Sequence, residues 1–177
     1  MYNQKELKSM LFIDIETVSE FNSYDQFKDA KPAIEKYWSK KAEQHRATES
    51  QLQTLSDSEL YDRMSALSPE FGKIIVISIG QIKFDETGEF STSKIKSFYG
   101  NDEAEILKEF MGTAQSIFNA SPGIQFIGHN IKNFDFPYLI KRAIIHGVSI
   151  PTQFHLQKKL YQCVEIFSLF QHLCSLF

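Results

Sequence analysis

Leu11-Phe12-Ile13-Asp14-Ile15-Glu16-Thr17 is the stretch of sequence that decides the fold. Its apolar part, which begins at Met10, is short and rich in Ile and Phe, and this predicts a buried β-strand over residues 10–15. Asp14 and Glu16 are two residues apart, so on a strand their side chains point to the same face. We therefore expect two neighbouring carboxylates at the end of a buried strand.

A second stretch, far along the chain, also leads from an apolar run to an acid. Residues 124–127 read Ile-Gln-Phe-Ile, a short and mostly apolar run that ends at Gly128, and the sequence then continues His129-Asn130-Ile131-Lys132-Asn133-Phe134-Asp135. We expect a strand over 124–128 and a helix over 137–145. The carboxyl ends of parallel strands meet at one edge of an open α/β sheet, where such sheets hold their sites. Two parallel strands would thus bring Asp14, Glu16 and Asp135 into one cleft.

The rest of the chain also predicts an α/β fold, with further strands and helices. Residues 73–79 are nearly continuous in β-branched side chains, Asp85-Glu86-Thr87-Gly88 is a turn, and residues 93–99 alternate, which together predict a hairpin. A helix capped by Asn101 follows, and residues 20–68 form a helix-prone insert with a helix start at Ser56. We expect a ribonuclease-H-like mixed sheet, an antiparallel meander plus parallel strands, flanked by helices.

Composition sets further limits. The 177 residues, with 42% apolar residues and a net charge of −3, fit one domain over residues 1–177, with the insert at about 20–68 and an atypical tail at 160–177. No apolar run reaches the roughly 18 residues that span a membrane. Because residues 1–9 are polar and charged, we expect no secretory signal before Leu11. Cys163 and Cys174 lack the spacing of a zinc site or a disulfide framework, so we expect a cytoplasmic protein.

One stretch of the insert is locally basic. Residues 28–46 hold six Lys or Arg against three acids, together with Tyr37 and Trp38. Such a stretch fits a helix that faces nucleic acid, and it fits a solvated amphipathic helix better. We favour the second interpretation at this point.

Three carboxylates without clustered Cys or His indicate hard, oxygen-seeking cations such as Mg²⁺ or Mn²⁺ rather than zinc. Asp14, Glu16 and Asp135 would suit a two-metal site for phosphodiester cleavage. Asp-x-Glu alone is a weak signal, because it also occurs at solvated strand ends. His-Asn-x-x-x-Phe-Asp is less usual, and its alternative is a loop whose polar residues only cap a helix.

The two motifs, Phe12-Ile13-Asp14-Ile15-Glu16-Thr17 and His129-Asn130-Ile131-Lys132-Asn133-Phe134-Asp135, resemble those of the DEDD superfamily of 3′→5′ exonucleases. Within it, residues 10–159 are most similar to predicted exonucleases that resemble the proofreading domain of B-family DNA polymerases. The resemblance implies that Asp14 bridges two Mg²⁺ or Mn²⁺ ions, that Glu16 ligates one of them, and that Asp135 holds the second.

The resemblance also implies contacts to substrate. Thr17 and Asn130 would help to bind the scissile strand, and Phe134 would stack near the terminal base. A core position is an equal alternative for Phe134. The expected partner is a nucleic-acid 3′ end, with single-stranded DNA favoured over RNA, and no membrane.

A third motif of the family, Tyr-x-x-x-Asp or His-x-x-x-x-Asp on a final helix, has no match, because no Asp follows Asp135. Tyr161 and Glu165 only superficially read as Tyr-x-x-x-Glu, and residues 160–170 are expected to form a strand instead. We therefore expect a fold truncated at its C-terminus and an impaired 3′→5′ exonuclease. Apolar residues of the tail offer a route to self-association. A non-catalytic nucleic-acid-binding module and an inactive fragment of the same fold stay open as alternatives.

Overall fold

The computed structural model describes residues 7–154 and 163–165. The chain divides into two compact units. The first, here called the sheet unit, comprises Met1–Glu16 and Ile75–Phe177, and the second, the helical unit, comprises Thr17–Ile74. That residues 1–177 act as a single domain stays a prediction.

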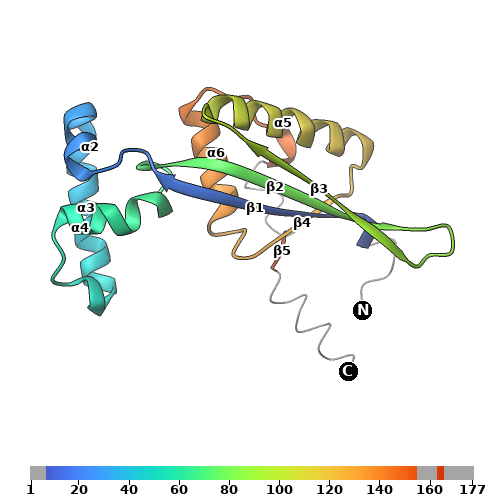
Figure 1. Cartoon of the computed structure of the whole chain (residues 1–177), viewed down its shortest axis with the longest axis horizontal. Coiled ribbons are helices and arrows are strands. Elements are labelled where there is room, and N and C mark those ends of the chain that lie inside the picture. Colours follow the sequence, from blue (N-terminus) through green and yellow to red (C-terminus); the bar gives the residue numbers. More distant parts are fainter. Residues whose placement is uncertain (1–6, 155–162, 166–177) are drawn as a thin grey trace. The chain divides into compact units, whose positions relative to one another are not determined.

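The centre of the sheet unit is a mixed sheet which, over the described residues, has five strands in the order β3-β2-β1-β4-β5 (Figure 1). Strands β2 and β3 pair antiparallel, whereas β4 pairs parallel with both β1 and β5. This confirms the predicted mixed sheet, and β5 lies within the residues expected to form a strand. The strands are β1 Met10–Ser19, β2 Gly72–Phe84, β3 Phe90–Tyr99, β4 Gln125–Gly128 and β5 Cys163–Glu165.

The hairpin between β2 and β3 turns at the predicted residues. The Asp85 carboxylate accepts hydrogen bonds from the backbone N–H groups of Thr87, at 2.9 Å, and Glu89, at 3.0 Å. Gly88 has a φ of 92°, a conformation that glycine adopts without steric cost. These contacts hold the turn together and lower the pKa of Asp85 from its usual value, the Thr87 side chain contributing most.

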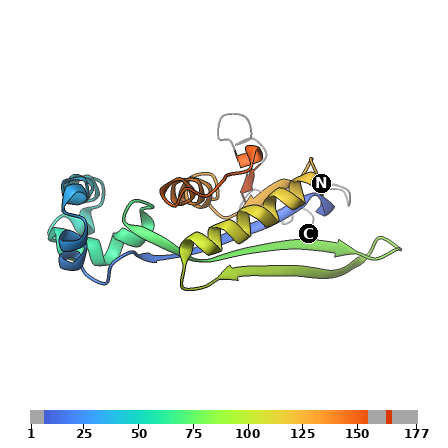
Figure 2. The same cartoon turned by 90° about the horizontal axis from the view of Figure 1, so that it is seen from above.

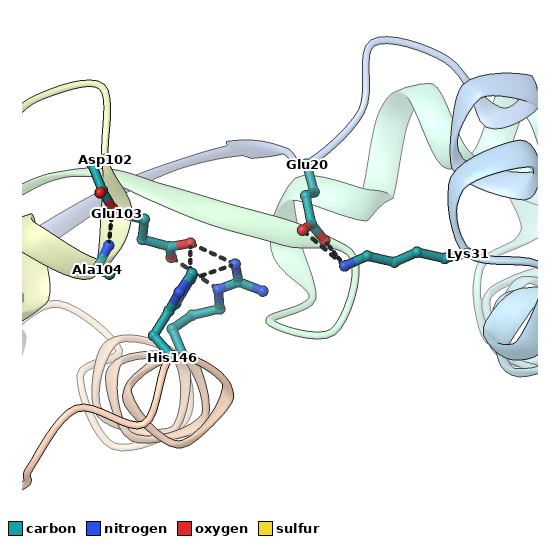
Figure 3. A network of polar contacts seen from close by, with 7 residues as sticks. Glu20, Lys31, Asp102, Glu103, Ala104 and His146 are labelled. Atoms are coloured by element: carbon teal, nitrogen blue, oxygen red, sulfur yellow. Dashed lines mark hydrogen bonds and ion pairs between the residues drawn. The ribbon is translucent and has the colours of Figure 1, made fainter.

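Two long helices belong to the sheet unit, α5 (Glu103–Ala120) and α6 (Asp135–Ile145), and α5 packs against both β3 and α6 (Figure 2). The sequence predicted Asn101 as the N-cap of α5, but the N-cap is the next residue, Asp102. The Asp102 carboxylate accepts from the N–H of Ala104 at 2.8 Å, because Asp102 is the last extended residue before the helix (Figure 3). Helix α6 begins two residues before the predicted Pro137, since proline is tolerated in a first turn.

An aromatic cluster fills the core between α5, β4 and α6. Phe154, in the 3₁₀ turn η4 (Thr152–Phe154), lies 5.3 Å from the ring of Phe126 and 5.4 Å from that of Phe136, measured between centroids. Its ring is also 5.5 Å from that of Phe118. Phe154 therefore packs α5, β4 and α6 together, and this packing positions the end of β4 and the start of α6.

The helical unit has a core of its own. It contains α2 (Tyr24–Ala30), α3 (Glu35–Thr48) and α4 (Asp57–Met64), with 3₁₀ turns η1 (Pro32–Ile34), η2 (Ser50–Leu52) and η3 (Ser65–Leu67). Trp38 and Tyr61 are fully buried with ring centroids 5.1 Å apart. Ser56 and Glu59 form a capping box at the start of α4, as the sequence predicted. The helix-prone insert is confirmed.

Most of the tail at residues 160–177 lies outside the residues that the structure describes. Tyr161 and the apolar residues after Glu165 lie outside the described residues, and with them the expected self-association through the tail. Within residues 7–154 and 163–165, no helix combines the length and the apolar character that crossing a bilayer requires.

Candidate functional site

The side chains of Asp14 and Glu16 leave β1 on the same face. Ile13 and Ile15 are 3% and 6% exposed, whereas both acids are exposed, which is the alternation of a half-buried strand. The strand is longer than predicted, because it continues to Ser19 instead of ending at Ile15. The acids nevertheless lie beyond the part of β1 that pairs with β4, since that register runs from Met10 to Phe12.

Asp135 reaches β1 from the first turn of α6. Its carboxylate oxygen Oδ1 accepts a hydrogen bond from the backbone N–H of Ile15 at 3.2 Å, and the residue is 2% exposed. Strand β4 ends at Gly128, so it offers no carbonyl at this level of β1, and the Asp135 carboxylate takes that place. The contact brings Asp135 beside the backbone between Asp14 and Glu16, across 120 positions of sequence.

A glycine makes this approach sterically feasible. A Cβ on Gly128 would lie 2.9 Å from both the carbonyl oxygen of Ile13 and the Cβ of Ile131, closer than real side chains come. Two residues later, Asn130 adopts a positive φ of 51°, and its carbonyl accepts from the N–H of Phe134 at 2.9 Å. The chain thereby turns sharply from β4 into α6. The sequence marked Gly128 only as the end of a strand.

The residues expected to contact substrate occupy different surroundings. Asn130 is exposed, and its Oδ1 accepts from the side-chain amide of Asn133 at 3.0 Å. Phe134 is half-buried with its ring 5.4 Å from that of Tyr138, a contact that fits the alternative of a packing role. Thr17 belongs to the helical unit, where its hydroxyl donates to the carbonyl of Ala66 at 2.9 Å. Their roles toward substrate stay predictions.

The acids match hard divalent cations in chemistry, because all their donors are carboxylate oxygens. Their present arrangement is not that of a closed metal site, since among the described residues no three His, Cys, Asp or Glu are gathered around one point. Asp135 is held by Ile15, whereas Asp14 and Glu16 are exposed and have room to turn. The donor set thus fits such ions, provided that the two exposed side chains rotate toward Asp135.

One further acid lies on the same sheet. Glu165 ends β5 in register with Gly128, and it is the only Asp or Glu in the sequence after Asp135. The sequence predicted that Glu165 belongs to a strand, and it lies in β5. Helix α6 is the last α-helix among the described residues, and Asp135 is the only carboxylate that it carries.

A family model described as the exonuclease domain of DNA polymerase family B matches residues 2–165. None of the curated proteins compared with the chain matches it. The match to the family model includes all three acids, Asp14, Glu16 and Asp135.

Similar solved structures include the family B DNA polymerase of the hyperthermophilic archaeon Pyrobaculum calidifontis. It is 14% identical with a TM-score of 0.42, over 92% of this chain and 16% of that chain. E. coli exonuclease I in complex with a dT13 oligonucleotide is 11% identical with a TM-score of 0.44, over 92% of this chain and 29% of that chain. The chain therefore spans less than a third of either protein.

Proposed function

Because this chain belongs to the family of exonuclease domains of DNA polymerase family B, we propose that it removes nucleotides from a nucleic-acid 3′ end by metal-dependent phosphodiester hydrolysis. The observation that supports this most is the hydrogen bond from the Ile15 N–H to the Asp135 carboxylate at 3.2 Å. It links the two segments that carry the acids, with Asp14 and Glu16 on either side of Ile15.

Each acid has a distinct part in the proposal. Asp14, Glu16 and Asp135 would hold Mg²⁺ or Mn²⁺. Such ions, when bound, lower the pKa of an attacking water and stabilise charge on the phosphate and the leaving oxygen. Asp135 is oriented in advance by its hydrogen bond to Ile15, so only Asp14 and Glu16 have to be ordered. Both residues are exposed, so a nucleic-acid strand would reach them from solvent.

We also propose that turnover by these 177 residues is slow. The family resemblance implies a further carboxylate after Asp135, and residues 136–177 contain no Asp. A set of hard oxygen ligands that lacks one member binds a divalent cation more weakly. Preference for single-stranded DNA over RNA and a cytoplasmic location belong to the same proposal.

The proposal is tested by incubating 5′-labelled single-stranded DNA with the protein and Mn²⁺. We expect slow shortening from the 3′ end that stops in EDTA and in Asp14→Ala. Asp62→Ala is the matched control, because it removes an exposed carboxylate from α4, outside the sheet unit. Absence of shortening in the wild-type protein, or equal shortening in Asp14→Ala, would overturn the proposal.

A further inference from the structure

The basic stretch of the helical unit divides into two sets of side chains. Lys31 pairs with Glu20 at 2.8 Å (Figure 3), and Arg46 pairs with Asp57 at 2.7 Å. Their charges are therefore largely neutralised within the unit. A second set forms no ion pair with any residue in the part of the chain that the structure describes: Lys36, Lys40 and Lys41.

Two of these lysines line a pocket of about 310 Å³ on α3. Tyr37, Lys40, Lys41 and Gln44 contribute to it at helical spacings of three and four residues, so they share one face of the helix. The remaining lining residues are Ile34, Glu70 and Phe71. We call this the basic pocket. Its volume is at the low end of the roughly 300–1,000 Å³ typical of ligand sites, which suits a single nucleotide unit.

Tyr37 gives the basic pocket an accessible aromatic surface. Its neighbour Trp38 is fully buried in the core of the helical unit, whereas Tyr37 is 57% exposed. The Lys36 ammonium lies 5.2 Å from the centroid of the Tyr37 ring. An exposed ring flanked by lysines combines a stacking surface for a base with cations for the backbone, as in proteins that bind single strands.

The local charge favours an anion. Lys40 and Lys41 outnumber Glu70, the one acid in the lining, although the whole chain carries a net charge of −3. The basic pocket would therefore attract a polyanion, even though the net charge of the whole chain is negative. Gln44 and the Tyr37 hydroxyl add hydrogen-bonding groups, which also suit a nucleotide.

We propose that the basic pocket binds one nucleotide unit of single-stranded nucleic acid, with a base on Tyr37 and the adjoining phosphates at Lys40 and Lys41. The proposal rests on the proposed function for the choice of nucleic acid as the ligand. It adds a contact in the helical unit, separate in sequence from Asp14, Glu16 and Asp135.

The test measures binding of fluorescein-labelled oligo(dT) and oligo(U) by anisotropy, in EDTA, at several salt concentrations. Tyr37→Ala should weaken binding roughly 5- to 150-fold, the loss of one stacked base, and Tyr37→Phe should retain most of the affinity. The double variant Lys40→Gln/Lys41→Gln should lower the slope of log affinity against log salt by about 1.4, because each phosphate contact to a single strand contributes about 0.7.

The matched control is Lys83→Gln/Lys94→Gln, which makes the same charge change at exposed positions of the β2–β3 hairpin. Equal effects of the two double variants would overturn the inference, because net charge alone would then explain binding. Retained affinity in Tyr37→Ala, or no binding by the wild-type protein, would overturn it too. Pocket-dependent binding without any shortening of DNA would support the inference and contradict the proposed function.

Discussion

The carboxylate of Asp135 accepts a hydrogen bond from the backbone N–H of Ile15, at the point of β1 where pairing with β4 has ended. A side chain thus substitutes for the carbonyl of a missing strand residue. The arrangement satisfies a buried backbone donor and holds an acid beside the backbone between Asp14 and Glu16. Asp135 therefore contributes both to the stability of the fold and to the proposed metal binding. Different substitutions of Asp135 can separate these two contributions.

Asp135→Asn and Asp135→Ala should differ in stability and agree in activity. Asn keeps a carbonyl oxygen for the Ile15 N–H, so we expect a small loss of unfolding free energy. Ala leaves that donor without its acceptor, which costs about 1–3 kcal/mol. Urea unfolding measures the difference. Both variants should lose Mn²⁺-dependent shortening of DNA, and an Asp135→Asn variant that remains fully active would show that the carboxylate serves only the fold.

Gly128→Ala should be destabilising by about 1–3 kcal/mol, the usual cost of overpacking a core. The new methyl group would meet the Ile13 carbonyl and the Ile131 side chain at 2.9 Å. Gly112→Ala is the control, because nothing lies within 4 Å of a Cβ there and alanine is the better helix former. Thermal unfolding should show a lower midpoint for the first variant only. Equal midpoints would mean that β1 and the turn after β4 separate easily.

Glu103→Gln should destabilise the sheet unit strongly. The Glu103 carboxylate lies 2.8 Å from Nε2 of His146 (Figure 3). It also accepts from Nε of Arg142 at 2.8 Å, and the Arg142 side chain is 2% exposed. Loss of one partner of a buried pair typically costs about 3–5 kcal/mol. Lys108→Gln, which breaks an exposed pair with Glu105, should change little. Similar unfolding midpoints for both variants would contradict this account of the junction between α5 and α6.

Alkaline pH should weaken the helical unit through Tyr61. Burial raises the pKa of Tyr61 from 10.0 to about 12. The unfolded chain ionises this phenol first, so its contribution to stability is complete below pH 10 and is lost as the pH rises through about 12. Tyr61→Phe should reduce this loss. An unchanged alkaline dependence in Tyr61→Phe would contradict the assignment.

Local signals account for what the sequence predicted correctly. Continuous β-branched residues indicated β2, Asp85 and Gly88 indicated its turn, and alternation placed Asp14 and Glu16 on one face. The parallel arrangement of β1 and β4 followed from topology rules and brought Asp135 to β1. Each of these predictions depends either on residues that are close in sequence or on a general rule of sheet topology.

What the sequence did not predict depends on contacts between distant residues. The need for glycine at position 128 arises from Ile13, and the central packing role of Phe154 arises from three separate elements. Trp38 and Tyr37 are adjacent in a basic stretch, yet one is buried and the other exposed. Which face of α3 packs is decided by α4 and by Phe71, which the sequence pattern of α3 alone does not encode.

We propose that β1 and the start of α6 form one site for divalent cations. Titration with Mn²⁺, followed by electron paramagnetic resonance, tests it without requiring turnover. The account predicts that the wild-type protein and Asp62→Asn bind Mn²⁺ alike, and that Asp14→Asn and Asp135→Asn each bind it about tenfold more weakly or worse. Equal binding by all four proteins, or no binding by the wild-type protein, would contradict the claim.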